Sequence, residues 1–375
     1  MNDDGAERPA GFAHLATRAV QGLRAYDPGH DLVAWRRRIG PSLVELGSNE
    51  NPWGASPAAR AAVLDVLHAL HRYPDPLGGD LKRALSQAHG VPPEALILGN
   101  GSHELLMQIA QVFAGEGDEV VASQYGFAVY ALAAQAAGAR LVTAPALPCD
   151  AAMPRGHDLG AIAAAIGPRT KLVYLANPNN PTGTWFGLEA LSGFLRRVPR
   201  GVLVVVDEAY AEFGEDGASA VSLLAAHPQL IVTRTFSKAY ALAGLRVGFA
   251  LAHPDCIAVF ERIRESFNVN MAGLAAAEAA LADTAHLRWV LARNAEEREK
   301  LDAALTARGW FVHPSRTNFL LVEFGARTAD IEAGLLERGI VPRPMGGYGL
   351  PECLRITVGD RDENRRLLAA LETMA

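Results

Sequence analysis

Between residues 46 and about 262, short apolar runs alternate with longer stretches of helical periodicity, and this alternation restricts the fold more than any other feature of the chain. The apolar runs, predicted to be strands, lie at residues 96–98, 119–122, 141–143, 171–175, 203–206 and 230–233. Continuous apolar strands are typical of a sheet that is covered on both faces. Residues 104–113 place apolar side chains on one helical face. We therefore expect an α/β fold, with a mostly parallel sheet sandwiched by helices in a large domain.

The last third of the chain changes character. A helical pattern covers residues 272 to about 308, and strand-like runs at 318–323 and 354–358 enclose a helix near 328–338. This pattern predicts a smaller α+β domain at the C-terminal end. We expect three parts: an N-terminal arm with short helices (1–45), the large domain (46–262) and the small C-terminal domain (263–375).

Charge and cysteine usage argue against several classes of protein. The formal net charge of -6 gives no reason to expect a nucleic-acid partner. Cys149, Cys256 and Cys353 lie far apart without metal-type spacing, which is typical of a reduced, cytoplasmic protein. The acidic N-terminus lacks the pattern of a signal peptide, and no apolar stretch is long enough to span a bilayer. We expect no membrane role.

Three polar residues follow predicted strands and suggest a cofactor. Asn180 comes after the run at 171–175, Asp207 closes the run at 203–206, and Lys238 follows the run at 230–233. The ends of parallel strands meet in one crevice, where ligands bind. Pyridoxal phosphate requires a lysine for a Schiff base, an acid beside its ring nitrogen and a cup for its phosphate. Taken singly, each residue has a plainer explanation as a surface lysine, a cap or a turn; their conjunction favours the cofactor.

A phosphate cup is predicted from a strand, glycine turn and helix start at residues 98–104. Backbone N–H groups at a helix N-terminus attract anions. We expect Ser102 as the N-cap of this helix, with His103 facing the phosphate and Ser237 and Arg246 completing the cup. A two-glycine turn alone is often only a connection.

Three further side chains are candidates at the cofactor ring and the substrate. Tyr210 is placed to donate its hydroxyl to the ring oxygen, and Tyr125 to stack on the ring face. Arg355 alternates with apolar neighbours at 354–358 and so points away from their face, where an arginine binds a carboxylate or phosphate in a bidentate manner. Core and solvated positions are the plainer alternatives for Tyr125 and Arg355.

The assembled motifs resemble those of the pyridoxal-phosphate-dependent aminotransferases of fold type I, and among them the histidinol-phosphate aminotransferase branch. The likeness runs from about residue 20 to Gly359 and includes Gly-Ser-Asn-Glu-Asn-Pro at 47–52, Arg-Tyr-Pro-Asp at 72–75, Asn-Pro-Thr-Gly at 180–183 and Leu-Arg-Ile-Thr-Val-Gly at 354–359. One departure is His103, where family members commonly carry Asp or Asn.

The resemblance implies roles for individual residues. Lys238 would carry the cofactor and move the substrate proton, while Asp207 pairs with the ring nitrogen. The other implied roles are ring-oxygen contacts for Tyr210 and Asn180, stacking for Tyr125, phosphate binding for Ser102, His103, Ser237 and Arg246, a contact to the neighbouring subunit's phosphate for Tyr73, and substrate contacts for Tyr26, Arg343 and Arg355. The Tyr73 contact implies a homodimer with shared active sites.

The reaction implied is transamination between histidinol phosphate and 2-oxoglutarate, in the histidine biosynthetic direction from imidazole-acetol phosphate and glutamate. An aromatic amino acid aminotransferase is the nearest alternative, since it would use the same Lys238 and Asp207. A decarboxylase of the same fold and a non-enzymatic ligand sensor are more distant alternatives.

Overall fold

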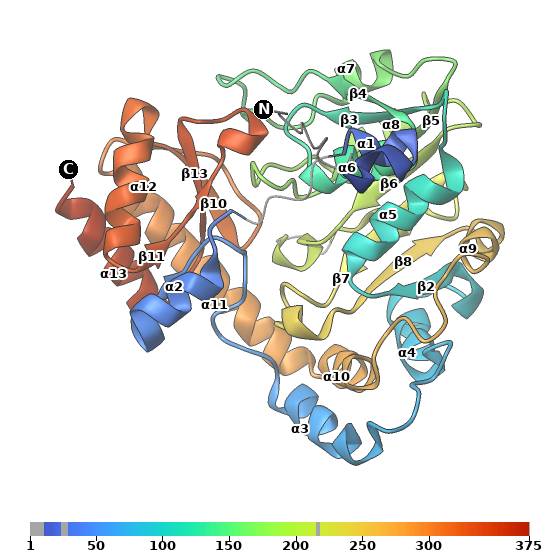
Figure 1. The fold of residues 1–375 in the computed structure, drawn as a ribbon, viewed down its shortest axis with the longest axis horizontal. Coiled ribbons are helices and arrows are strands. Elements are labelled where there is room, and N and C mark those ends of the chain that lie inside the picture. Colours follow the sequence, from blue (N-terminus) through green and yellow to red (C-terminus); the bar gives the residue numbers. More distant parts are fainter. Residues whose placement is uncertain (1–10, 24–28, 215–217, 375) are drawn as a thin grey trace, which may run out of the picture.

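The protein is described by a computed structural model that covers residues 11–23, 29–214 and 218–374. It has a large domain built on a seven-stranded sheet and a smaller one built on a four-stranded sheet (Figure 1). The large sheet has the spatial order β2 (Leu96–Gly99), β8 (Gly248–Ala252), β7 (Leu230–Thr235), β6 (Leu203–Asp207), β5 (Thr170–Ala176), β3 (Glu119–Ser123), β4 (Arg140–Ala144). Its strands from β7 to β4 are parallel, and β8 is antiparallel to both of its neighbours. The expected α/β fold is confirmed.

Helices cover both faces of the large sheet, because the central strands are apolar on both sides. One face packs on α5 (Ser102–Phe113), α6 (Ala128–Ala136) and α9 (Pro254–Phe260). The other face packs on α3 (Pro57–Val66), α4 (Gly79–His89), α7 (Leu159–Ala164), α8 (Leu188–Leu195) and α10 (Met271–Ala282). Buried strand residues such as Val205 and Val206 therefore face opposite apolar layers.

The small domain is α+β, as predicted. Its antiparallel sheet has the order β12 (Arg343–Pro344), β13 (Cys353–Thr357), β10 (Phe319–Glu323), β9 (Phe311–Val312). It packs with α11 (Thr284–Thr306), α12 (Thr328–Glu337) and α13 (Arg361–Glu372). The helix expected over residues 272–308 is in fact two helices. Asp283 separates them, because its side chain accepts the His286 N–H and begins α11.

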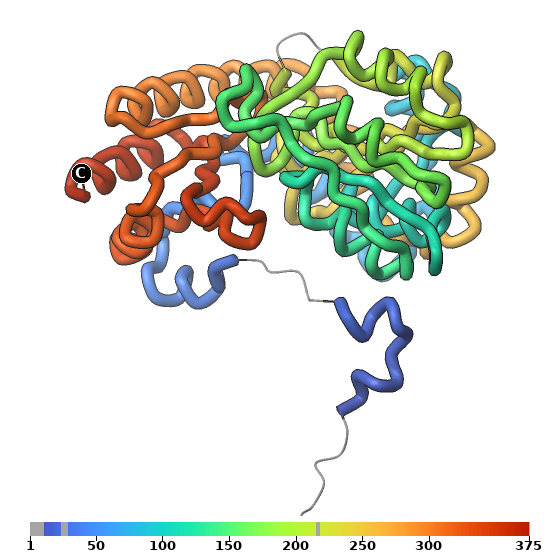
Figure 2. Tube along the Cα trace, turned by 90° about the horizontal axis from the view of Figure 1, so that it is seen from above, coloured from blue at the N-terminus to red at the C-terminus, as the bar shows by residue number. Residues whose placement is uncertain are grey.

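The N-terminal segment reaches into the small domain. After α1 (Arg18–Gln21) and α2 (Leu32–Ile39), strand β1 (Val44–Glu45) pairs in parallel with β11 (Ile340–Val341). Figure 1 shows α2, in blue, beside β11 and α13 of the small domain. Figure 2 shows residues 11–23, in dark blue, projecting from the large domain, where α1 contacts α6. α10 in turn packs against α3 and α4, so the boundary expected at residue 262 stays a prediction.

No helix among the residues that the structure describes has the length and apolar content needed to cross a bilayer.

Candidate active site

The ends of three neighbouring parallel strands bring the predicted residues together. Asp207 pairs in register with Ala176 of β5 and Thr233 of β7. Lys238 follows β7 at the same edge of the sheet. A cavity of about 860 Å³ opens there between the two domains. Ten of the thirteen predicted site residues line this cavity: Ser102, His103, Asn180, Asp207, Tyr210, Ser237, Lys238, Arg246, Arg343 and Arg355.

Asp207 lies at the floor of the cavity, only 5% exposed. Its Oδ2 accepts a hydrogen bond from the Tyr130 hydroxyl (3.1 Å) and its Oδ1 one from Thr233 Oγ1 (3.2 Å). Burial raises the pKa of Asp207 to about 6, although both hydroxyls act in the opposite direction. Every side-chain donor to Asp207 that the structure records is electrically neutral.

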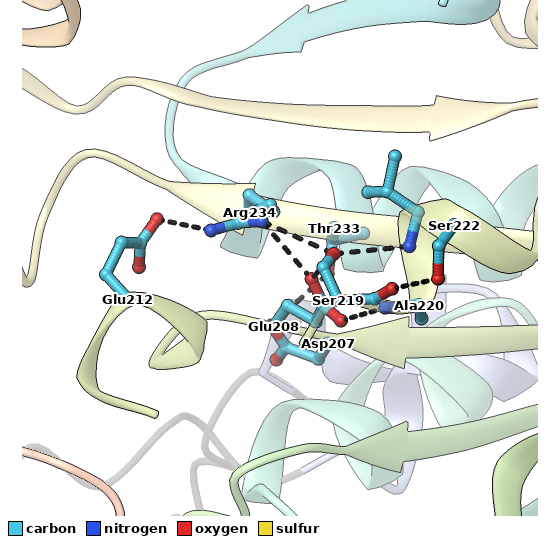
Figure 3. Close-up of polar contacts among 9 residues, drawn as sticks. Asp207, Glu208, Glu212, Ser219, Ala220, Ser222, Thr233 and Arg234 are labelled. Atoms are coloured by element: carbon cyan, nitrogen blue, oxygen red, sulfur yellow. Dashed lines mark hydrogen bonds and ion pairs between the residues drawn. The ribbon is translucent and has the colours of Figure 1, made fainter. Parts of the chain in front are cut away.

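The next residue, Glu208, has a different environment (Figure 3). Its carboxylate lies 3.4 Å from Arg234 Nη1, and Arg234 Nη2 is 2.7 Å from Glu212. Glu208 also accepts hydrogen bonds from the Ser219 hydroxyl and the Ala220 N–H, both at 2.6 Å. A buried cation thus neutralises Glu208, while the negative charge of Asp207 stays available to a ligand.

Lys238 extends its amine to two backbone carbonyls of the N-terminal segment. Its Nζ donates to Ser48 O and Asn49 O, both at 3.1 Å. Burial, and next the charge of Arg355, lower the pKa of Lys238 to about 8. A lysine with a lowered pKa is a better nucleophile near neutral pH.

The predicted phosphate cup has a different helix cap from the one we expected. Gly101, not Ser102, is the N-cap of α5, and Ser102 is the first helical residue, so the expectation for Ser102 was wrong in this detail. Gly101 has φ +82°, and a Cβ there would lie 2.3 Å from Arg246 Nη2. Only glycine combines that backbone conformation with so close an approach. Arg246 Nη1 donates to Ser237 Oγ (3.3 Å), so charge, hydroxyl and helix N-terminus meet.

His103 also lines this cup. Burial, and next the charge of Arg246, lower the pKa of the His103 imidazole. This direction of the pKa shift favours the uncharged imidazole, and Arg246 supplies the positive charge of the cup.

Two arginines of the small sheet also line the cavity. Arg343 of β12 and Arg355 of β13 are directly paired in the antiparallel register. Arg355 is buried and donates to Asn180 Oδ1 (2.6 Å) and Gly47 O (2.7 Å). Because Asn180 accepts from Arg355 with its oxygen, its amide nitrogen is oriented as a donor.

The sequence interpretation missed contacts made by residues 48 and 49. Asn49 Nδ2 donates to the Tyr210 hydroxyl (2.9 Å), and Asn49 is itself held by Thr357 (3.0 Å). Burial raises the pKa of Tyr210 to about 12, which keeps it a neutral hydroxyl donor. The phrase at 47–52 was a family-like signal, but its contacts cross from one domain to the other.

Two predicted residues that the structure describes, Tyr125 and Tyr73, do not line the cavity. Tyr125 packs instead against a small-domain cluster that includes Met345 and Leu350, while Phe127 lines the cavity. Stacking by Tyr125 would thus require its side chain to turn. Tyr73 is 79% exposed and stacks on Phe267 with 4.6 Å between ring centroids. Tyr26 lies outside the described residues.

Comparison with known proteins defines the class of this protein. The profile of the family "Aminotransferase class I and II" matches residues 41–371. The chain belongs to this family and is a transaminase that uses pyridoxal phosphate.

Within that family the chain belongs with the histidinol-phosphate aminotransferases. It is 46% identical to histidinol-phosphate aminotransferase 2 of Pseudomonas fluorescens (strain Pf0-1), over 96% of this chain and 97% of that protein. It is 44% identical to histidinol-phosphate aminotransferase 1 of Nitrosococcus oceani, over 97% of each chain. The crystal structure of histidinol-phosphate aminotransferase from Sinorhizobium meliloti in complex with pyridoxal-5'-phosphate matches with a TM-score of 0.87 and 33% identity, covering 96% of this chain and 98% of that one. These relatives do not favour the aromatic alternative.

The residues of the cavity fit pyridoxal phosphate. A buried carboxylate (Asp207) suits its basic ring nitrogen, and a neutral hydroxyl (Tyr210) suits its ring oxygen. The cup that an added Cβ at Gly101 would fill suits its phosphate. Lys238, with its lowered pKa, completes the set.

Proposed function

We propose that this enzyme transfers the amino group between glutamate and imidazole-acetol phosphate, giving 2-oxoglutarate and histidinol phosphate, a step of histidine biosynthesis. The observation that carries the proposal is the pairing of Arg343 with Arg355 in the wall of the cavity that Lys238 also lines. Like charges directly opposite on adjacent strands destabilise a sheet. An anionic substrate group would offset that cost.

The two substrates present anions at corresponding places. In glutamate the carbon that bears the amine also bears a carboxylate, and in histidinol phosphate it bears a phosphomethyl group instead. One buried guanidinium can bind either anion through paired N–H donors. We assign this contact to Arg355, which Asn180 and the Gly47 carbonyl hold in place. Arg343 adds a second positive charge beside it.

Lys238 is the proton carrier in this proposal. When bound, pyridoxal phosphate supplies an electron sink for the charge that develops as the substrate loses its α-proton. Lys238 Nζ takes that proton and returns it at the end of the transfer. Its lowered pKa places the amine close to the neutral form that accepts a proton.

The remaining cavity residues hold the cofactor and its charge. Asp207 binds the protonated ring nitrogen, and its negative charge stabilises the positive one. Tyr210 and Asn180 donate to the ring oxygen. Ser102, Ser237 and Arg246 at the α5 N-terminus would hold the phosphate, because N–H groups and a guanidinium are available there.

The substrate is tested by single-turnover reaction of the loaded enzyme with L-histidinol phosphate, L-histidinol and L-phenylalanine, following loss of the cofactor's visible band. Histidinol phosphate should react fastest. Histidinol, which lacks the phosphate, should be slower by roughly 10- to 100-fold, the value of a lost charged hydrogen bond. Equal rates for histidinol and its phosphate, or a faster reaction with phenylalanine, would overturn the substrate assignment.

We also propose that the enzyme is a cytoplasmic homodimer whose partner subunits complete each other's sites. Large apolar side chains are exposed along α3 and the segment after it (Leu64, Leu67, Leu70, Tyr73 and Leu77), and the exposed Phe267 stacks on Tyr73. Exposed apolar patches of this kind are typical of protein interfaces. Tyr73 is the most exposed of these side chains after α3, and its hydroxyl is open to a partner subunit. All three cysteines are free, which fits a reducing compartment.

Subunit sharing is tested by mixing two inactive variants, Lys238→Ala and Tyr73→Ala. If Tyr73 serves the partner's cavity, each mixed dimer contains one intact site. Activity should then recover to about a quarter of the wild-type value, the statistical share in a randomised twofold dimer. A monomer by light scattering, or no recovery after demonstrated subunit exchange, would contradict the shared site.

A further inference from the structure

Tyr130 is a buried residue that contacts Asp207 from the helix layer behind the sheet. It lies on α6, is 1% exposed, and donates its hydroxyl to Asp207 Oδ2 at 3.1 Å. Thr233 occupies the other oxygen, Oδ1, at 3.2 Å. A carboxylate has about four lone-pair sites, so the Tyr130 and Thr233 hydroxyls and the Ala209 N–H together leave Asp207 able to accept from a group in the cavity.

The contrast between the neighbouring acids Asp207 and Glu208 shows what a neutral donor achieves. Figure 3 shows Glu208 beside Arg234, whereas Asp207 contacts Thr233. An arginine next to a carboxylate cancels its charge toward a third group. A phenol or hydroxyl stabilises the anion through a hydrogen bond but leaves its net charge in place.

The ring of Tyr130 packs against two other aromatic rings, and this packing orients its hydroxyl. Its ring stacks on Tyr174, with centroids 4.8 Å apart and an interplanar angle of 4°. It also meets Phe127, which lines the cavity, edge to face at 6.0 Å. The Tyr174 hydroxyl donates to Leu106 O (2.7 Å) and so anchors the stack without touching Asp207.

We propose that Tyr130 is a positioning residue for transamination: its hydroxyl keeps Asp207 ionised and directs the free side of the carboxylate at the ring nitrogen of pyridoxal phosphate. The proposal rests on the role of Asp207 proposed above and goes beyond it, because Tyr130 touches neither cofactor nor substrate.

The effects of neighbouring groups on the pKa of Asp207 agree with this role of Tyr130. Burial disfavours its ionised form, and the Tyr130 hydroxyl is the foremost group acting in the opposite direction, followed by Thr233 and the Ala209 N–H. The negative charge of Glu208 disfavours ionisation further. Burial and the charge of Asp207 raise the pKa of Tyr130 well above its ordinary value, so Tyr130 stays a donor. Two further titratable neighbours, Tyr174 and Tyr210, likewise have raised pKa values and stay neutral.

The test compares two cofactors on the full-length chain freed of cofactor. One is pyridoxal phosphate, and the other is its 1-deaza analogue, in which carbon replaces the ring nitrogen. The ratio of their dissociation constants isolates the contact between the ring nitrogen and Asp207. Tyr130→Phe removes one oxygen and keeps the ring stack. We expect it to reduce the preference for pyridoxal phosphate about tenfold or more, the range for a hydrogen bond to a charged group.

Tyr174→Phe is the matched control, since it also removes one buried hydroxyl from the same stack and should leave the ratio unchanged. If both variants reduce the ratio equally, Tyr130 acts only through packing and the proposal fails. It also fails if Tyr130→Phe keeps the wild-type ratio. A wild-type protein that does not distinguish the two cofactors would instead refute the role of Asp207 itself.

A second measurement requires no substitution. With tyrosine carbon-13 labelled at Cζ, the Tyr130 signal of the cofactor-free protein should shift as Asp207 titrates, around pH 6. The Tyr130 signal is the one missing from Tyr130→Phe, and its movement at that pH supports the hydrogen bond. If that signal does not move across that pH, the bond to Asp207 is absent and the proposal is overturned.

Discussion

Replacing Arg234 by methionine is the most informative perturbation of the framework behind the site. Arg234 is 9% exposed, and its guanidinium contacts the carboxylates of Glu208 and Glu212. Glu208 is 2% exposed and directly follows Asp207. Methionine has a similar length and no charge. The variant would leave two buried carboxylates without their cation.

The magnitude follows from burial and from the contacts that remain. Breaking a buried ion pair by removing one partner costs about 3–5 kcal/mol. Glu208 keeps its hydrogen bonds from Ser219 and the Ala220 N–H. We therefore expect a loss at the lower end, about 3 kcal/mol in the free energy of unfolding.

The loss should also depend on pH. Burial raises the pKa of Glu208, and the charge of Arg234 opposes this, so the variant raises that pKa further. A carboxyl whose pKa is higher in the folded than in the unfolded state binds its proton more tightly in the folded state. Lowering the pH therefore stabilises the folded state through this group. As the pH falls through the folded pKa, Glu208 becomes neutral. The difference in free energy of unfolding between the wild type and Arg234→Met should then become smaller.

The assay is urea unfolding followed by circular dichroism at one fixed cofactor concentration, because a bound ligand itself adds stability. Arg293→Met is the matched control. Arg293 pairs with Glu296 on the exposed face of α11, with side chains 52% and 47% exposed. Such a surface pair contributes less than about 1 kcal/mol. If Arg234→Met costs no more than Arg293→Met, the buried network does not stabilise the strand ends and the reasoning is refuted.

Three further predictions concern the cavity. In the cofactor-free protein, attachment of pyridoxal to Lys238, trapped by borohydride, should rise with pH around a midpoint of about 8; a midpoint at the ordinary 10.5 would contradict the lowered pKa. Gly101→Ala should weaken binding of pyridoxal phosphate about tenfold or more, because its Cβ displaces Arg246. Gly115→Ala is the control, because its added Cβ meets nothing within 4 Å, and it should not weaken binding of the cofactor. If Gly101→Ala and Gly115→Ala give the same cofactor titration curve, Gly101 does not form part of a phosphate site. Asp207→Ala should lower kcat at least about 100-fold, and a near-normal kcat would assign the ring nitrogen to another residue.

Much of the cavity could be predicted because its residues follow strands. A polar residue after a buried parallel strand is placed at the edge of the sheet by the strand itself. Asp207 and Lys238 needed only the strand assignments at 203–206 and 230–233, which β6 and β7 confirm. Arg355 could be predicted to leave the apolar face, since Leu354 and Ile356 lie in the core of the small domain.

Other features depend on contacts or conformations that a local pattern does not contain. The cap of α5 is set by the backbone of Gly101, which no side-chain preference reveals. The break before α11 did have a local signal, because Asp283 is a good N-cap residue. The Tyr130 contact to Asp207 spans 77 residues, and the phenol reads as an ordinary core residue of an apolar helix.

The amine of Lys238 lies on carbonyls of residues 48 and 49, and this has a consequence for synthesis on the ribosome. Asn49 is held by Thr357, which is 308 residues away along the chain. At roughly 5–20 residues per second, about 15 to 60 s separate the translation of these two residues. The part of the cavity formed by the ends of β5, β6 and β7 can fold during that interval. The carbonyls of residues 48 and 49 that accept from Lys238 cannot yet be fixed in place. A nascent chain would therefore present an incomplete cavity until almost the whole protein has emerged, and cofactor capture is expected to come after translation.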